Sequence, residues 1–209
     1  MRLLEGKVAV VTGAGSGLGR EYAIAFALNG AAVIVNDFGA SVDGERMQSN
    51  SADQVVDEII SRGGKAVANT ASVADWDGAK SMIETAVQHF GRLDIVVNNA
   101  GNNRPSSLVD LTEQDVDSQI GVHLKGTLAV SHFAAAYWNE VGVDAHRAIV
   151  NTTSAAGLHP TAGAGVYGAT KSAIAALTMS HAQELARLGV RVNAVAPCAR
   201  TRMVNESPT

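Results

Sequence analysis

The sequence predicts an α/β fold, a doubly wound parallel β-sheet with helices on both faces, formed by a single domain over residues 1–209. Short β-branched segments alternate with longer helical patterns along the chain, and this alternation is typical of βαβ units. Several strand segments are apolar throughout, as expected for strands that helices cover on both faces. The length is sufficient for one domain with a substantial core.

Six segments predict the strands. In chain order they are KVAVVT (7–12), AAVIVND (31–37), KAVANTA (65–71), LDIVVNN (93–99), RAIVNTT (147–153) and VRVNAVA (190–196). Helical patterns lie between neighbouring strands, and the longest begins at Thr112 and reaches about Asn139. The helix after the second strand is expected to open with a capping box at Ser51, in SADQ. The polar segment 38–50 before it is longer than usual connections and predicts a functional or mobile loop.

Composition and charge exclude several classes of function. The net charge is −4 and basic residues are scattered, so nucleic acid is not an expected partner. Apolar runs are too short to span a bilayer, and Glu5 and Lys7 stand where a signal peptide would be apolar; a cytoplasmic protein is therefore expected. The single cysteine, Cys198, excludes an intrachain disulfide and is expected to be a small packed residue. The histidines have no spacing that suggests a metal site.

A glycine-dense turn, TGAGSGLG (12–19), follows the first strand and opens a helix. Leu18 occupies the last glycine position of the six-residue dinucleotide fingerprint, so that pattern fails, but Gly13, Gly17 and Gly19 keep a related spacing. Glycines let the backbone approach a pyrophosphate, and the helix start favours its charge. We therefore expect Gly13, Ser16, Gly17, Leu18 and Gly19 to bind a dinucleotide, although a tight turn without a ligand is the alternative.

The second strand ends at Asp37, eighteen residues after Gly19. This spacing is close to that of the acid that binds the adenosine ribose hydroxyls in dinucleotide folds. A carboxylate there would repel a 2′-phosphate, and neither Ser16 nor Phe38 supplies an arginine for it. NAD is thus the predicted cofactor; the alternative is that Asp37 only caps the loop.

Tyr167 and Lys171 are four residues apart in GVYGATKSAIAAL, a segment otherwise made of small and aliphatic residues. In a helix these positions share one face, so the ammonium can approach the phenol. Taken alone, the pair is more often a surface feature than an active site.

Four motifs in order change that interpretation: TGAGSGLG, NNAG (98–101), Ser154 in NTTSAAG, and YGATK (167–171). With these, the chain resembles the short-chain dehydrogenase/reductase family from Gly6 to about Met203. The resemblance implies a Rossmann-type fold and an oxidoreductase. Finer features, NDFGA, GGKAVANTASV, VHLKGT and APCARTRM, are similar to the (R)-3-hydroxyacyl-CoA dehydrogenase subfamily of peroxisomal multifunctional enzymes type 2 and their bacterial single-domain relatives.

The resemblance implies roles for the catalytic set. Tyr167 would exchange the proton of a secondary alcohol or ketone, and Lys171 would lower the pKa of that phenol and hold the nicotinamide ribose. Ser154 would hydrogen-bond the substrate oxygen. The family commonly has an asparagine where this chain has His123, and imidazole can also relay protons. A packed, non-catalytic histidine is the alternative.

Further cofactor contacts follow from the resemblance. They are expected at Phe38, Ser72, Val73, Asn99, Ala100, Gly101, Pro197 and Thr201, besides Tyr167 and Lys171. For NNAG the alternative is a simple turn after a strand. After the sixth strand the family usually has Pro-Gly, whereas this chain has Pro197-Cys198.

The expected function is NAD-dependent interconversion of a secondary alcohol and a ketone, with a 3-hydroxyacyl-CoA-like compound as a candidate substrate. An NADP-dependent ketoacyl reductase and a non-catalytic nucleotide-binding or assembly protein are the alternatives. The resemblance also implies a homodimer or homotetramer joined by the 112–139 helix and the helix that carries Tyr167. Because the chain stops at Thr209, the family's substrate lid and last strand are expected to be missing from it.

Overall fold

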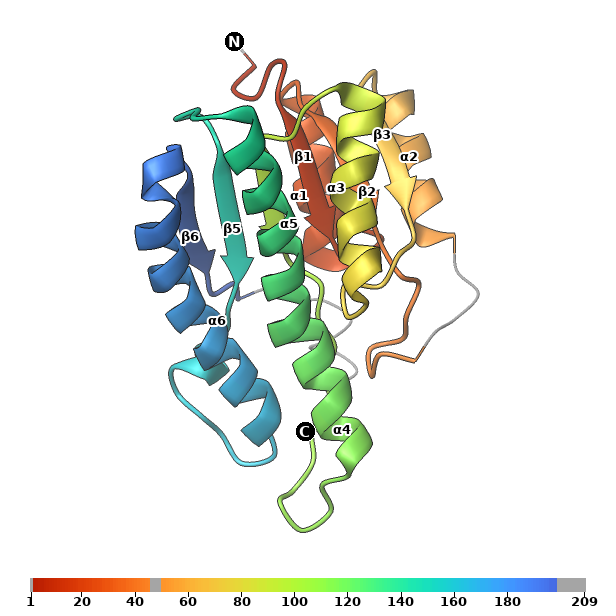
Figure 1. The fold of residues 1–209 in the computed structure, drawn as a ribbon. Coiled ribbons are helices and arrows are strands. Elements are labelled where there is room, and N and C mark those ends of the chain that lie inside the picture. The colour runs from red at the N-terminus through yellow and green to blue at the C-terminus, as the bar shows by residue number, and fades with distance from the viewer. Residues whose placement is uncertain (1, 46–49, 199–209) are drawn as a thin grey trace.

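The computed structural model describes residues 2–45 and 50–198 and contains a six-stranded parallel sheet (Figure 1). The strands are β1 (Val8–Thr12), β2 (Ala32–Asn36), β3 (Lys65–Asn69), β4 (Ile95–Asn98), β5 (Ala148–Thr152) and β6 (Arg191–Val195). Their order in the sheet is β3-β2-β1-β4-β5-β6, and every neighbouring pair is parallel. All six predicted strands and the doubly wound α/β fold are confirmed.

Helices connect the strands. They are α1 (Gly17–Leu28), α2 (Ser51–Ser61), α3 (Trp76–Phe90), α4 (Glu113–Gln119), α5 (Gly126–Val141) and α6 (Gly165–Leu185), with short 3₁₀ turns η2 (Ala155–Gly157) and η3 (Ala186–Leu188). The strand order reverses at β1, which lies between β2 and β4. In open parallel sheets, ligands bind outside the carboxyl ends of the strands at such a reversal.

Two hydrophobic cores lie on the two faces of the sheet. Val8 and Val10 of β1 belong to the core that contains α3 and α5 residues, whereas Ala9 and Val11 belong to the core with α1 and α2 residues. Successive strand residues point to opposite faces, so β1 is buried along its whole length. The continuous apolar runs of the sequence are explained by this double cover.

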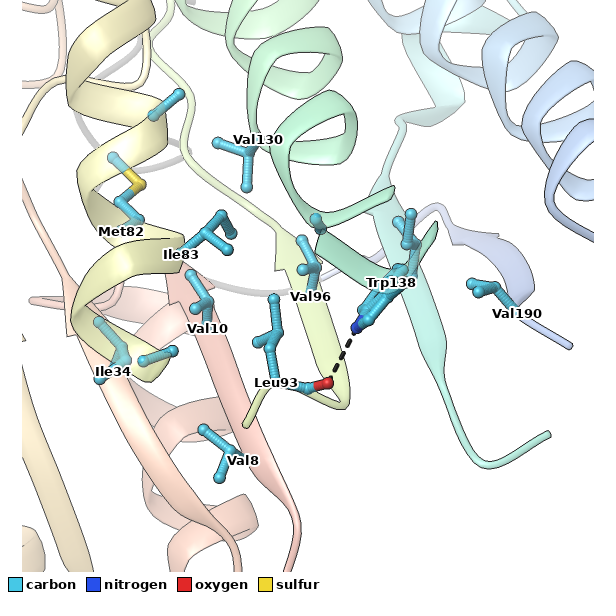
Figure 2. Packing of buried hydrophobic residues seen from close by; sticks show 14 of the residues in the cluster. Val8, Val10, Ile34, Met82, Ile83, Leu93, Val96, Val130, Trp138 and Val190 are labelled. Carbon is cyan, nitrogen blue, oxygen red and sulfur yellow. Dashed lines mark hydrogen bonds between the residues drawn. The ribbon is translucent and has the colours of Figure 1, made fainter. Parts of the chain in front are cut away.

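Trp138 of α5 belongs to the core that contains α3 and α5 residues (Figure 2). Its indole is fully buried, and Nε1 donates a 2.8 Å hydrogen bond to the carbonyl oxygen of Leu93, just before β4. A buried indole N–H needs such a partner. The contact fixes α5 against the amino end of β4, which leaves the carboxyl ends of the strands for the site.

The predicted helix starts have different outcomes. Thr112 is the N-cap of α4, and a capping box with Asp115 is present, so that start is confirmed. The capping box predicted at Ser51 is wrong: Asn50 is the N-cap of α2, and Ser51 is already helical. The Ser51 hydroxyl instead donates a 3.1 Å hydrogen bond to Asp37, because the start of α2 lies beside the residue that follows β2.

The long helix predicted from Thr112 to Asn139 is continuous, but a π-helical segment, η1 (Ile120–Lys125), joins α4 to α5. A π segment inserts an extra residue into the helical turn, and such segments are frequent at functional sites. His123 lies in this segment and is buried. The hydrophobic pattern could not predict the register change that turns His123 inward.

Candidate active site

A cavity of about 730 Å³ lies at the carboxyl ends of the strands, in the place expected for a doubly wound sheet. The predicted site residues that line it are Gly13, Ser16, Gly17, Leu18, Asp37, Phe38, Ser72, Val73, Asn99, Ala100, Gly101, His123, Ser154, Tyr167, Lys171 and Pro197. Gly19 does not line it, and Thr201 lies outside the described residues. The predicted set is thus brought together around one cavity, with these two exceptions.

The glycine turn after β1 requires glycine for two different reasons. Gly13 has φ +63°, and a Cβ on it would lie 2.8 Å from the Cα of Ala100. A Cβ on Gly19 would lie 2.2 Å from the carbonyl oxygen of Gly13. Gly13 therefore keeps the cavity wall close to the backbone after β4, and Gly19 lets α1 pack beneath the turn.

The start of α1 has the donor set of an anion site. Its N-cap, Ser16, makes no side-chain capping hydrogen bond, and the first turn contains no acidic residue. The first amides of a helix have no partner within the helix, and the positive end of its dipole adds to their attraction for anions. The turn and the helix start therefore fit a pyrophosphate.

Thr12 fastens the end of β4 to the glycine turn. Its Oγ1 accepts hydrogen bonds from the amides of Asn99 and Ala100, both at 3.0 Å, and the Asn99 side chain donates to the Thr12 carbonyl oxygen at 2.9 Å. NNAG is therefore more than a turn after a strand. It is one wall of the cavity, held in register with the glycine turn across neighbouring strands.

Asp37 lies between the glycine turn and the loop after β2. Its carboxylate accepts hydrogen bonds from the amides of Gly15 (2.9 Å) and Gly39 (2.8 Å) and from the Ser51 hydroxyl (3.1 Å). It therefore caps the loop, which was the alternative considered for it. It also lines the cavity, so its negative charge faces any ligand there.

Ser154 and Tyr167 approach each other from different elements. Ser154 is the N-cap of η2, just after β5, and Tyr167 lies in the first turn of α6. Their side chains form a hydrogen bond that favours the phenolate, but burial raises the pKa of Tyr167 and is the larger effect. The phenol is therefore protonated at neutral pH in the ligand-free protein.

Lys171 is a buried cation beside this phenol. It is 3% exposed, its Nζ donates a 2.8 Å hydrogen bond to the Thr152 carbonyl oxygen, and Nζ lies 5.6 Å from the centre of the Tyr167 ring. Burial lowers the pKa of Lys171 to about 8. Desolvation is the larger effect on the Tyr167 pKa in this structure, and the expectation that Lys171 lowers this pKa stays a prediction.

His123 is buried against α6, the helix that carries Tyr167. Its ring meets the Tyr167 ring edge-on at 5.4 Å, and Nε2 lies 2.8 Å from the carbonyl oxygen of Asn102. Burial, with a contribution from the Lys171 charge, lowers the pKa of His123 to about 3. The imidazole is therefore neutral, and its buried Nδ1 has no hydrogen-bond partner. Both the relay and the packing interpretations are compatible with this position.

Several cavity residues were not predicted. They are Asn36, Ala40, Ser41, Val42, Gly44, Ala71, Ala74, Asn102, Asp117, Ser118, Gly121, Val122, Thr152, Thr153 and Cys198. The length of segment 38–50 pointed to part of this set. The rest comes from positions within two residues of predicted ones, from α4 or from η1. Cys198 is exposed at the cavity, so its prediction as a packed residue is wrong.

Within the described residues, no group of three or more His, Cys, Asp or Glu side chains is placed to hold a metal ion. No described helix is long and apolar enough to cross a membrane.

The family model described as short chain dehydrogenase matches residues 7–209. The chain belongs to the short-chain dehydrogenase family. Curated relatives include the peroxisomal multifunctional enzyme type 2 of Drosophila melanogaster, 46% identical over 95% of this chain and 32% of that enzyme. A hydroxyacyl-CoA dehydrogenase of Mycobacterium tuberculosis is 43% identical over 96% of this chain and 63% of its own length. The chain thus spans about a third of the first relative and under two thirds of the second.

A putative short-chain dehydrogenase/reductase of Mycobacterium tuberculosis is 41% identical, with 97% of this chain and 70% of that protein covered. Among solved structures, a short chain dehydrogenase from Mycobacterium avium has 49% identity and a TM-score of 0.88, covering 96% of this chain and 70% of that one. A short chain dehydrogenase from Burkholderia cenocepacia, described in complex with NADP, has 33% identity and a TM-score of 0.84. A 7α-hydroxysteroid dehydrogenase, described in complex with NADH, has 31% identity and a TM-score of 0.88. They cover 97% and 99% of this chain and 78% and 76% of theirs.

Proposed function

We propose that residues 1–209 form one catalytic domain that interconverts a secondary alcohol and a ketone with NAD. The observation that carries the proposal is the convergence of Ser154, Tyr167 and Lys171 on the same cavity as the glycine turn. A module that only binds nucleotide needs the turn but has no need for the three side chains. This argues against the non-catalytic alternative.

The cavity fits a nicotinamide dinucleotide. It is as large as typical small-molecule sites, and its lining joins the glycine turn to Tyr167 and Lys171. When bound, the dinucleotide supplies the hydride acceptor or donor of the reaction. The turn after β1 and the start of α1 would hold its pyrophosphate, and Lys171 would hold its nicotinamide ribose.

Tyr167 is the group that moves the proton. Because burial raises its pKa, the phenol is the resting form and suits proton donation to a ketone. For oxidation of an alcohol the phenolate is needed, and the Ser154 hydrogen bond and the positive charge of Lys171 both favour it. Ser154 would also orient the substrate oxygen. Both reaction directions thus use the same three side chains.

NAD rather than NADP is proposed on account of Asp37. Its carboxylate lines the cavity and is fixed by three hydrogen bonds, so a 2′-phosphate placed near it would meet a fixed negative charge. Related structures are described with either dinucleotide, and the family alone does not choose between them. An NADP-dependent ketoacyl reductase is the second candidate, since a 3-oxoacyl-carrier-protein reductase is also among the relatives.

A 3-hydroxyacyl-CoA-like compound is proposed as the substrate class. Support comes from the relatives named as hydroxyacyl-CoA dehydrogenase and peroxisomal multifunctional enzyme type 2. A homodimer or homotetramer in the cytoplasm is proposed as well. The helices expected to form the subunit contact expose Ile120 (40%) and Met179 (65%). Sedimentation of the purified chain tests the assembly, and fractionation of the source cells tests the location.

A screen of secondary alcohols and 3-hydroxyacyl-CoA thioesters with NAD and NADP in parallel tests the function. Formation of reduced dinucleotide is followed by absorbance. The proposal predicts turnover with NAD that exceeds turnover with NADP. Binding of NAD without turnover on any member of the panel would favour the non-catalytic alternative, and a preference for NADP would overturn the choice of cofactor.

A further inference from the structure

The loop after β2 does not extend into solvent but lies against the segment after β4. Residues 38–45, here called the strap, form a compact turn in which the Ser41 amide donates to the Glu45 carbonyl oxygen at 2.9 Å. The amide of Asn103 donates to the Val42 carbonyl oxygen at 3.0 Å. Two loops from non-neighbouring strands are therefore joined through their backbones.

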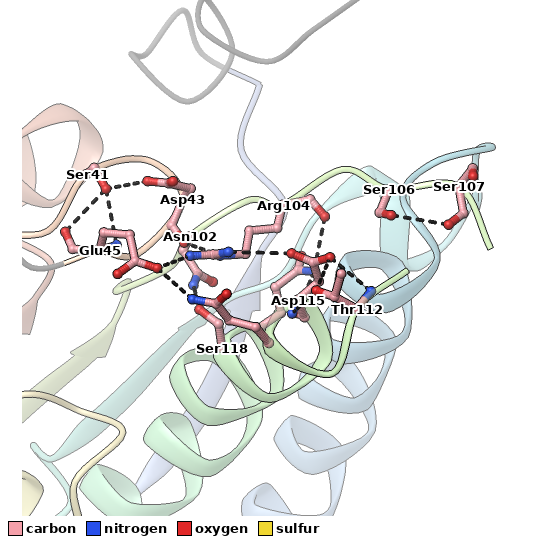
Figure 3. A network of polar contacts seen from close by, with 12 residues as sticks. Ser41, Asp43, Glu45, Asn102, Arg104, Ser106, Ser107, Thr112, Asp115 and Ser118 are labelled. Carbon is pink, nitrogen blue, oxygen red and sulfur yellow. Dashed lines mark hydrogen bonds and ion pairs between the residues drawn. The ribbon is translucent and has the colours of Figure 1, made fainter. Parts of the chain in front are cut away.

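The side chain of Arg104 adds further contacts between the strap and the segment after β4 (Figure 3). Its Nε donates a 2.5 Å hydrogen bond to the Asp43 carbonyl oxygen, and its guanidinium pairs with the carboxylate of Glu45. On the other side it lies 3.5 Å from a carboxylate oxygen of Asp115. The guanidinium fork suits several acceptors held at fixed positions at once.

The two carboxylates that Arg104 contacts differ in exposure. Asp115 is fixed, because it completes the capping box of Thr112 at the start of α4, and it is 17% exposed. Glu45 on the strap is 59% exposed, whereas Arg104 itself is 14% exposed. Arg104 thus lies between a largely buried carboxylate of α4 and an exposed carboxylate of the strap. The Gln114 side chain adds a 2.9 Å hydrogen bond to Glu45.

The strap is held by close packing against Asn102 as well as by charged contacts. Gly44 has φ +92°, and a Cβ on it would lie 2.5 Å from Nδ2 of Asn102. Asn102 in turn donates a 2.7 Å hydrogen bond to the Ser118 hydroxyl in α4. Only glycine fits this approach without strain, so the position of the strap depends on Gly44 independently of any charge.

The strap crosses the site. β1 lies between β2 and β4 in the sheet, so a link from the end of β2 to the segment after β4 passes over the carboxyl end of β1 and its glycine turn. Strap residues Ala40, Ser41, Val42 and Gly44 line the same cavity as that turn. A ligand on the turn therefore lies beside the strap.

We propose that the strap closes over the bound dinucleotide and that Arg104 is the positioning residue that keeps it closed. This rests on the proposed binding of NAD. Breaking the Arg104 contacts frees the strap, so the dinucleotide leaves faster, while the catalytic side chains on η2 and α6 keep their places. The dissociation rate, rather than the chemical step, is the quantity that Arg104 controls.

Stopped-flow release of NADH, chased with excess NAD, tests the proposal. We expect release from Arg104→Ala to be about tenfold faster than from the unchanged chain, as for loss of charge-assisted hydrogen bonds. Glu45→Ala should show a smaller increase, and the double variant should be no faster than Arg104→Ala, since both changes remove one contact. Arg62→Ala, which removes a surface ion pair with Glu58 in α2, is the matched control and should release NADH at the unchanged rate.

Gly44→Ala displaces the strap without removing a charge and should also accelerate release. In steady state, Arg104→Ala should raise KM for NAD without lowering kcat, a split that general destabilisation does not produce. Unchanged release from both Arg104→Ala and Gly44→Ala would overturn the strap proposal alone. Failure of the unchanged chain to bind NADH would overturn the proposed function and the strap with it.

Discussion

The Nζ of Lys171 lies 5.6 Å from the centre of the Tyr167 ring and donates its hydrogen bond to the Thr152 carbonyl oxygen. The two side chains share one face of α6, as their spacing of four residues requires. The ammonium is nevertheless fixed by β5, not by the phenol. Lys171 therefore acts on Tyr167 as a nearby buried charge, and its own position costs stability.

Lys171→Met should stabilise the fold while it abolishes turnover. Burial lowers the pKa of Lys171 from 10.5 to about 8, so between these values the unfolded chain binds more protons and the stability of the unchanged protein rises with pH. We expect the variant to gain about 1–2 kcal/mol at pH 7, because a buried charge is replaced by an apolar side chain. Denaturant unfolding from pH 7 to pH 11 measures the difference, which should disappear above the unfolded pKa.

Lys80→Met is the matched control for this series. Lys80 forms an exposed i,i+4 ion pair with Glu84 and is 54% exposed, and surface pairs contribute little. Its free energy of unfolding should follow that of the unchanged chain at every pH. If Lys171→Met were less stable than the unchanged chain at pH 7, the account of Lys171 as a destabilising buried cation would be wrong.

His123 should remain neutral well into acid. Its pKa is lowered to about 3, so its ring resonances should not titrate between pH 8 and pH 4 in an NMR experiment. The unfolded state binds a proton below about pH 6.5, and the contribution of His123 to stability is therefore lost as the pH falls from 6.5 towards 3. Titration of this ring near pH 6 would contradict the buried position.

Substitution of His123 distinguishes a role in proton relay from a role in packing. Asparagine can keep a donor to the Asn102 carbonyl oxygen, so His123→Asn should fold, whereas His123→Ala should lose about 2–4 kcal/mol of stability through the cavity and the unpaired carbonyl. A relay role predicts that His123→Asn alters the pH profile of kcat. A packing role predicts an unchanged profile, measured at saturating NAD.

Asp37→Asn should weaken the preference for NAD over NADP. The change removes the negative charge from the cavity wall and keeps one acceptor oxygen. Because the amides of Gly15 and Gly39 bond different oxygens of the carboxylate, the asparagine oxygen can accept from one of them only. We expect the dissociation constant of NADP divided by that of NAD to fall about tenfold or more, and a tenfold fall corresponds to about 1.4 kcal/mol. Titration calorimetry with both dinucleotides measures this ratio. An unchanged ratio would mean that Asp37 serves only as a loop cap.

The fold could be predicted because its signals are local. Continuous apolar strands such as β1 and the glycine turn that follows it mark βαβ units without knowledge of distant contacts. The convergence of the predicted site residues follows from the fold, because the carboxyl ends of parallel strands meet at one edge of the sheet.

Other features depend on contacts between distant segments and could not be predicted. Ser51 matches a capping pattern, but its hydroxyl donates to Asp37, which is 14 positions away in the sequence. The direction of Lys171 is set by the Thr152 carbonyl on another element. The junction of Arg104 with the strap joins residues that lie about sixty positions apart in the chain.

Comparison of Tyr167→Phe with the unchanged chain tests the central claim most directly. The substitution removes the phenolic hydroxyl and keeps the ring that packs against His123. With a substrate found in the screen and NAD, kcat should fall by at least about a thousandfold, towards the limit expected for loss of an essential acid or base, while the dissociation constant of NADH stays within about twofold. Turnover by Tyr167→Phe at the rate of the unchanged chain would contradict the account.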